Sequence, residues 1–313
     1  MARVPLNQVD LGFELSVEAG ENLKIIDLAR CLSLMNRKMY RSGMVYSIDG
    51  ISVACPNSVT NEFEVWKIPE IYNVSASYRL AFETWREQRA EAAVDIGDSP
   101  SPMGRWSDFK LFYNENHLAG DYDEVYPEGI DAGAWAAITG GEWNRADIVF
   151  YDAANAVHTM PIGMLGADNT PTYGGVIEAW GDTRTGVMTP DPLLPDAFSE
   201  SWIGHTGPAA EALEEPVQVL IADENDFPPY QFEADPTQDP KYTGASIATD
   251  GVPHSVQLVN SVNQNTHISG GLFPLGFIVF KYFGLETSQM KLIVHVSRGE
   301  YKGVAALPLG DFS

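Results

Sequence analysis

Alternating apolar and polar positions recur along the chain and predict a protein made mostly of β-strands. Residues 43–55 (GMVYSIDGISVAC), 61–69 (NEFEVWKIP) and 107–115 (SDFKLFYNE) alternate in the way half-buried strands do. The apolar runs 271–283 and 291–298 predict two core strands paired through the turn GLETSQ. Roughly eight to ten strands are expected in all, without a repeating β-α-β order.

Two segments have helical spacing instead. Residues 73–95 predict a helix whose apolar stripe, built around Tyr78, Phe82 and Trp85, faces the core. Residues 22–41 predict an amphipathic helix with apolar positions at Ile25, Leu28, Ala29, Leu32, Met35 and Met39.

The middle of the chain has a different texture. From residue 118 to 215, short apolar segments are separated by long stretches rich in Gly, Pro, Asp and Thr. Long loops between short strands are typical of jelly rolls, so the fold class predicted is mostly β, a jelly-roll β-sandwich with long loops and one or two helices. The expected organisation is an N-terminal segment over residues 1–42, with the basic helix, followed by a jelly-roll domain with long surface-loop insertions over residues 43–313.

Charge is distributed unevenly. The formal net charge is −24, yet residues 111–240 hold two basic residues, Arg145 and Arg184, against 24 acidic ones. One part of the surface is therefore strongly anionic, which disfavours nucleic acid and anionic membranes there. A solvated acidic exterior and a cation-binding surface both remain open.

The densest basic cluster lies in the helix predicted over 22–41. It contains Arg30, Arg37, Lys38 and Arg41. These residues form either a solvated helix face or a phosphate-facing, nucleic-acid-binding surface.

No signal for catalysis or a metal centre is found. The two cysteines make neither a disulfide framework nor a zinc cluster, and the six histidines lack metal-ligand spacing. We therefore expect no catalytic residues, no metal site and no cofactor. The chain's start has no signal-peptide core, and its apolar run GLFPLGFIVF is far shorter than the ~20 residues of a membrane span, so a soluble protein in a reducing compartment, with no membrane partner, is expected.

The stretch 221–232 (IADENDFPPYQF) allows two interpretations. Asp223, Glu224 and Asp226 resemble the calcium-binding linker of cadherins, which suggests a structural Ca²⁺ ion. Alternatively, Pro228 and Pro229 end a strand rigidly because they cannot pair in a ladder, and Tyr230 packs back on the sandwich. In this second interpretation the segment is a structural loop at a subunit contact.

Several segments, in order, resemble one protein family. They are NRKMYRSGMVYSI (36–48), SYRLAFETWREQR (77–89), RWSDFKLFYNENH (105–117), ENDFPPY (224–230) and GGLFPLG (270–276). Together they resemble capsid proteins of environmental small circular single-stranded DNA viruses.

The resemblance implies a structural coat protein that assembles with many copies of itself into an icosahedral shell around single-stranded DNA. It further implies location in the virion, assembly inside the host cell and a host receptor that the sequence does not identify. Unlike many such proteins, this chain has only Arg3 as a basic residue among its first twenty, so Arg30, Arg37, Lys38 and Arg41 would face the genome. The alternatives are an acidic β-sandwich that binds calcium or carbohydrate, and a hydrolase with a carboxylate pair.

Overall fold

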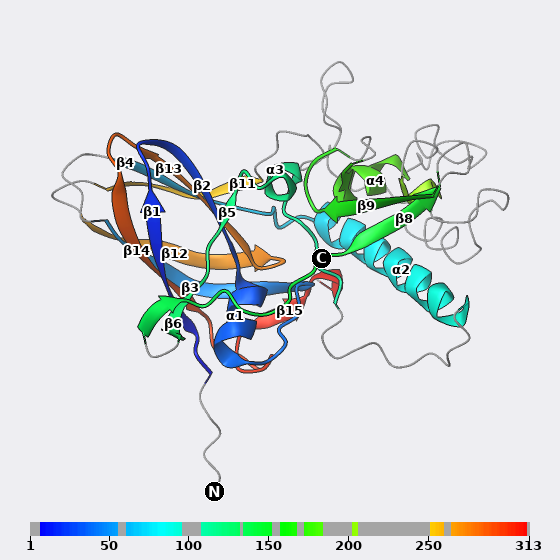
Figure 1. Cartoon of the computed structure of the whole chain (residues 1–313), viewed down its shortest axis with the longest axis horizontal. Coiled ribbons are helices and arrows are strands. Elements are labelled where there is room, and N and C mark those ends of the chain that lie inside the picture. Colours follow the sequence, from blue (N-terminus) through cyan, green and yellow to red (C-terminus); the bar gives the residue numbers. More distant parts are fainter. Residues whose placement is uncertain are drawn as a thin grey trace, which may run out of the picture. The chain divides into compact units, whose positions relative to one another are not determined.

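The protein forms two compact units, each described here by itself. The computed structural model describes residues 7–55, 61–95, 108–131, 134–151, 157–167, 172–183, 202–205, 251–259 and 264–311. The first unit comprises residues 1–70, 119–144 and 251–312, and the second comprises residues 71–118 and 145–250, with Ser313 (Figure 1).

The first unit is built on two five-stranded sheets. One has the order β1-β14-β3-β12, with β15 also paired to β3, and all its pairs are antiparallel. Its strands are β1 (Asp10–Val17), β3 (Met44–Ala54), β12 (Asn265–Pro274), β14 (Ser288–Val296) and β15 (Ala306–Pro308).

The other sheet has the order β11-β4-β13-β2-β5. The pairs are antiparallel except for the short parallel contact of β5 with β2. Its strands are β2 (Gly20–Asp27), β4 (Asn61–Lys67), β5 (Asp123–Glu124), β11 (Val252–Val259) and β13 (Phe277–Gly284).

Eight of these strands follow the jelly-roll order. In chain order these are β1, β2, β3, β4, β11, β12, β13 and β14. The first, eighth, third and sixth of them form one sheet, in that spatial order. The second, seventh, fourth and fifth form the other. Successive strands therefore alternate between the sheets except for β4 and β11, which pair within one sheet, as in two interlocked Greek keys. The predicted jelly-roll β-sandwich is confirmed.

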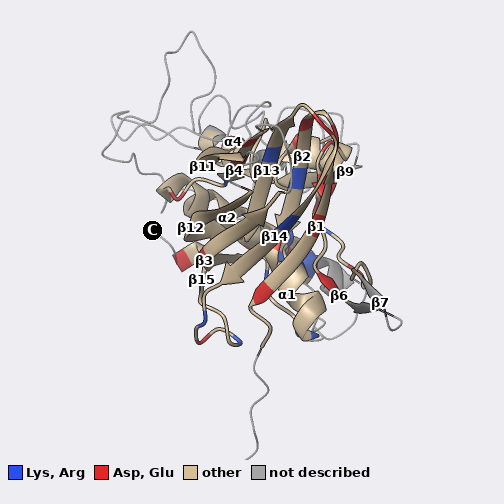
Figure 2. Ribbon diagram, turned by 90° about the vertical axis from the view of Figure 1, so that its left-hand side faces the viewer, with Lys and Arg blue, Asp and Glu red and all other residues tan. Residues whose placement is uncertain are grey.

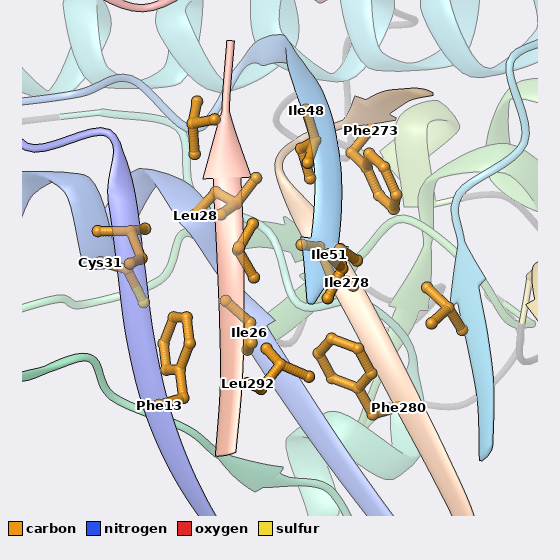
Figure 3. Packing of buried hydrophobic residues seen from close by; sticks show 14 of the residues in the cluster. Phe13, Ile26, Leu28, Cys31, Ile48, Ile51, Phe273, Ile278, Phe280 and Leu292 are labelled. Carbon is orange, nitrogen blue, oxygen red and sulfur yellow. The ribbon is translucent and has the colours of Figure 1, made fainter. Parts of the chain in front are cut away.

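The core lies between the two sheets. Alternate residues of each strand point inward, as in β1, where Leu11, Phe13 and Leu15 are buried. Figure 3 shows Phe13 and Leu292 from one sheet and Phe280 from the other directed into the same interior. Burial of each large apolar side chain contributes about 1.5–3 kcal/mol, so this cluster is the main stabilising feature of the unit.

The predicted helix over 22–41 is wrong in its extent. Residues 20–27 form β2, and the helix α1 (Leu28–Asn36) begins only afterwards. The β-branched pair Ile25–Ile26 lies within an eight-residue antiparallel ladder with β13, and this pairing outweighs the local helical spacing. The sandwich accordingly includes β1 and β2, which precede residue 43, where the jelly roll was expected to begin.

Other strand predictions were confirmed in position but not always in pairing. β3 and β4 match the alternating segments 43–55 and 61–69. The segment 271–283, expected to be one strand, is divided by a turn at residues 275–276 into the end of β12 and most of β13, and the segment 291–298 lies mainly in β14. β13 pairs with β2 and β4, while β14 pairs with β1 and β3. The expected hairpin is wrong because the turn GLETSQ carries the chain from one sheet to the other.

The remaining elements of the first unit are short. β6 (Glu128–Asp131) and β7 (Ala134–Ala137) form a two-stranded ribbon, and the 3-10 helix η3 (Leu309–Asp311) follows β15.

The second unit packs helices with a small sheet. The helix α2 (Tyr72–Asp95) confirms the helix predicted over 73–95, and the rings of Tyr78, Phe82 and Trp85 contact Phe109 at centroid distances of 5.3–5.9 Å. Residues 108–115, expected to be a strand, contribute only an isolated bridge at Phe112. The other elements are α3 (Glu115–Ala119), β8 (Asp147–Tyr151), β9 (Val157–Gly163), β10 (Gly174–Gly175), α4 (Val176–Asp182) and the 3-10 helix η2 (Trp202–His205).

The helix content is low, as predicted, although the described ranges contain four α-helices rather than one or two. Within these ranges, no helix is long and apolar enough to cross a membrane.

Candidate nucleic-acid interface

The helix α1 and the turn after it position the predicted basic residues. The Asp27 carboxylate caps the helix by accepting a hydrogen bond from the Arg30 backbone N–H at 3.0 Å, and it also accepts one from the Trp143 indole at 2.9 Å. The helix ends at Arg37, whose φ of 52° lies in the left-handed region. The chain therefore turns sharply at Arg37, and Arg37, Lys38 and Arg41 are exposed on the connection to β3.

Arg30 is not part of this exposed set. Its guanidinium forms an ion pair with Glu124 and lies 4.7 Å from the centre of the Tyr126 ring. The Tyr126 hydroxyl donates to the same carboxylate at 2.8 Å. Arg30 therefore holds α1 to β5 and to Tyr126 just after it. Because only 15% of its side chain is exposed, it is removed from the candidate phosphate-binding residues.

Cys31, on the same helix, gives a testable pH dependence. Its thiol is buried 3.8 Å from the Val125 carbonyl, and burial, reinforced by Asp27, raises its pKa well above the usual 9.0. An unfolded chain ionises this thiol at lower pH than the fold does, so unfolding releases a proton above about pH 9. The free energy of unfolding is therefore expected to fall there, by about 1.4 kcal/mol per pH unit for this group.

Urea unfolding of the reduced protein between pH 8 and 10 measures this effect. Cys31→Ala should retain the contributions of all other groups and lose this part of the slope. An unchanged slope in Cys31→Ala would contradict the assignment.

A second loop, which sequence reasoning missed, lies against the first. The Lys302 ammonium donates to the Met39 carbonyl and lies 5.2 Å from the centre of the Tyr301 ring. The Tyr40 hydroxyl donates to the Lys302 carbonyl at 3.0 Å, and the rings of Tyr40 and Tyr301 meet edge to face at 6.1 Å. These contacts hold residues 297–305 beside residues 36–43.

The two loops together form a region that we call the basic end. It consists of Arg37, Lys38, Arg41, Arg298 and Lys302, all exposed, and the two loops contain a single acidic residue, Glu300. Figure 2 shows Lys and Arg near the lower ends of β15 and α1. In a chain of net charge −24, this concentration of positive charge is a local reversal of sign that attracts phosphate groups.

Hydrogen bonds preorganise the basic end. The Lys38 ammonium donates to the Asn7 side-chain oxygen at 2.6 Å, and the Arg41 backbone N–H donates to the Tyr301 hydroxyl at 3.1 Å. Burial, followed by the nearby Tyr301, raises the pKa of Tyr40, so that hydroxyl stays protonated and able to donate at neutral pH. The positive charges are thus carried on ordered loops.

A chain of hydrogen bonds crosses the outer face of the β1-β14-β3-β12 sheet. His295 Nδ1 lies 2.8 Å from the Asp10 carboxylate, His295 Nε2 lies 3.0 Å from Ser52 Oγ, and His267 Nδ1 lies 3.4 Å from the same oxygen. Because a carboxylate only accepts, His295 donates from Nδ1 to Asp10; in the neutral imidazole Nε2 then accepts from Ser52. The strands β1, β14, β3 and β12 each contribute one residue to these hydrogen bonds.

The order Ser–His–Asp is also that of a hydrolase triad. Acyl transfer additionally needs free N–H donors for the oxyanion. Around Ser52 the backbone belongs to the paired ladders of β3 with β14 and β12. We therefore interpret this series of hydrogen bonds as a structural link between neighbouring strands.

The second group of predicted residues lies outside the described ranges. These residues are Asp223, Glu224, Asp226, Pro228, Pro229 and Tyr230, so the calcium and loop interpretations both remain predictions. Among the residues that are described, no three His, Cys, Asp or Glu side chains form a group able to hold a metal ion.

Comparisons of the chain with protein-family models, with curated proteins and with solved structures gave no match.

Proposed function

We propose that this chain is a viral coat protein that assembles with copies of itself into a small icosahedral shell around circular single-stranded DNA. The observation that carries the proposal is the complete jelly-roll strand order of the first unit, an architecture used by viral capsid proteins. Lectins and cupins share this architecture, so the fold alone does not decide the function.

The distribution of charge favours the coat protein over these alternatives. The basic end offers five exposed cations on ordered loops at one place on the sandwich. The acidic residues are concentrated instead between residues 111 and 240. A shell protein needs this polarity, because one part of each subunit contacts packaged phosphates while other parts face solvent.

Electron microscopy and sedimentation of the pure protein, with and without circular single-stranded DNA, test the proposal. Closed particles of many subunits are expected, and DNA should favour their formation at low salt. A protein that stays monomeric at high concentration and physiological salt, with and without DNA, would refute it. A large calcium-dependent rise in melting temperature without particles would instead support the calcium-binding alternative.

A further inference from the structure

The strands β11 and β12 carry no charged side chain of their own. The neighbouring strand β4 does, with Glu62 and Glu64 paired to Leu258 and Val256. Residues 251–280 contain no Asp, Glu, Lys or Arg, although 20% of the whole chain is charged, and about six charges would be expected in a stretch of this length. The run includes β11 and β12 entirely. In Figure 2 both strands are tan, whereas β1, β2, β13 and β14 carry red or blue segments.

These two uncharged strands are the edges of their sheets. Among the described strands, β11 pairs only with β4, and β12 pairs only with β3. They lie side by side, because His254 Nε2 is 2.9 Å from the Ser269 carbonyl and the Thr266 hydroxyl donates to the Gln257 side chain at 3.3 Å. We call this side of the sandwich, residues 252–259 and 265–274, the neutral edge.

The neutral edge also exposes apolar side chains. Val256 is 51% exposed and Leu258 is 57% exposed, both on β11. An edge strand with exposed apolar residues and no charge is a template for association with another chain, and most proteins protect such an edge with charged residues. The opposite edge strand, β1, has that protection in Asp10 and Glu14.

We propose that the neutral edge is the contact between two copies of this chain, which meet edge to edge across a two-fold axis. Two copies with a net charge of −24 each repel one another over most of their surfaces, and this repulsion is smallest where both carry no charge. A cationic partner would be attracted to the acidic surfaces instead. Nucleic acid finds no Lys or Arg among the residues of the neutral edge, and Lys67, which donates to the Leu272 carbonyl, is largely buried and paired with Glu70. Depletion of charge at the centre of the contact is characteristic of protein interfaces.

The proposed contact specifies how copies of the chain would associate and rests on the proposed self-assembly. An experiment can nevertheless refute the contact or the shell separately. The test variant is the double change Val256→Glu and Leu258→Glu. The matched control is Ile293→Glu and Leu307→Glu, which alters two apolar side chains exposed to 41% and 61% outside the neutral edge and adds the same charge. Sedimentation over a range of concentrations measures the association of each.

The wild type is expected to associate, the test variant to associate about 100-fold more weakly, and the control to match the wild type, because like charges opposed in an interface strongly disfavour it. The milder pair Val256→Thr and Leu258→Thr, which adds no charge, should weaken association by about 10-fold. Circular dichroism confirms that each variant folds.

Each outcome decides one of the two proposals. If the wild type forms dimers but no larger particles, the proposed contact stands and the proposed shell is refuted. Particles that form equally well from wild type and test variant keep the shell and refute the contact. A wild-type protein that is monomeric throughout refutes both.

Discussion

Replacing Arg37, Lys38 and Arg41 together with Gln is expected to weaken the binding of single-stranded DNA by about 100-fold at 0.1 M salt. Each cation that contacts a phosphate releases condensed counterions, which contributes about 0.7 to the slope of log K against log salt for a single strand. At 0.1 M salt this equals about five-fold in affinity per contact, so three contacts multiply to about 100-fold. All three residues are exposed, so the loss of fold stability should be small.

The salt dependence separates a direct contact from an indirect effect. In fluorescence anisotropy titrations between 50 and 300 mM salt, the slope should become shallower by about 2 in the triple variant. The matched control changes Arg79, Arg86 and Arg89 to Gln, three exposed arginines of α2, and removes the same charge. If the control loses as much affinity and slope as the triple variant, then net charge rather than the basic end determines binding.

The sequence predicted the fold class because alternation depends only on local burial. The segments that became β3 and β4 alternate cleanly, since one face of each strand meets the core and the other does not. The apolar stripe of α2 was predicted equally well, because Tyr78, Ala81 and Trp85 are buried at helical spacing. These signals are confined to a few neighbouring residues, so no knowledge of the rest of the chain was needed.

Pairing and strand boundaries could not be predicted in the same way. Ile25 and Leu28 have a helical spacing, yet Ile25 lies in β2 opposite Val279, more than 250 residues away in the sequence. Such a partner leaves no trace in the local pattern. The hairpin expected between β13 and β14 failed for a related reason, since in this jelly roll the connection after β13 carries the chain to the other sheet.

The candidate site was predicted in part. Arg37, Lys38 and Arg41 are exposed, which both interpretations of the basic cluster require, so phosphate binding there stays a prediction. Arg30 lies in the same cluster of the sequence but is held by Glu124, a residue outside the segment. Lys302 was missed because a lone lysine near the chain's end carries no signal by itself. Contacts between residues far apart in the sequence, such as those of Tyr40 with Tyr301 and Lys302, bring its loop to the others.

Changing Gly270 to Ala is expected to destabilise the first unit by about 3 kcal/mol, which is large for the addition of one methyl group. Gly270 lies in β12 between Ser269 and Gly271, which pair with Gly50 and Ile48 of β3. A Cβ at this position would lie 1.9 Å from the Ile48 carbonyl oxygen and 2.5 Å from the Asp49 carbonyl carbon. Both are backbone atoms within a ladder, so no side-chain rotation can relieve the overlap, and the strands must separate.

Gly12→Ala is the matched control, because Gly12 also lies in an edge strand, β1, and a Cβ there would meet no atom within 4 Å. It should be neutral or stabilise by up to about 1 kcal/mol, since alanine restricts the unfolded chain. Chemical denaturation of both variants measures the difference in the free energy of unfolding. Equal effects would show that β12 can move away from β3 at little cost. A large loss only for Gly270→Ala would establish that the neutral edge is built on a tight pairing of two backbones, which presents a rigid surface for association.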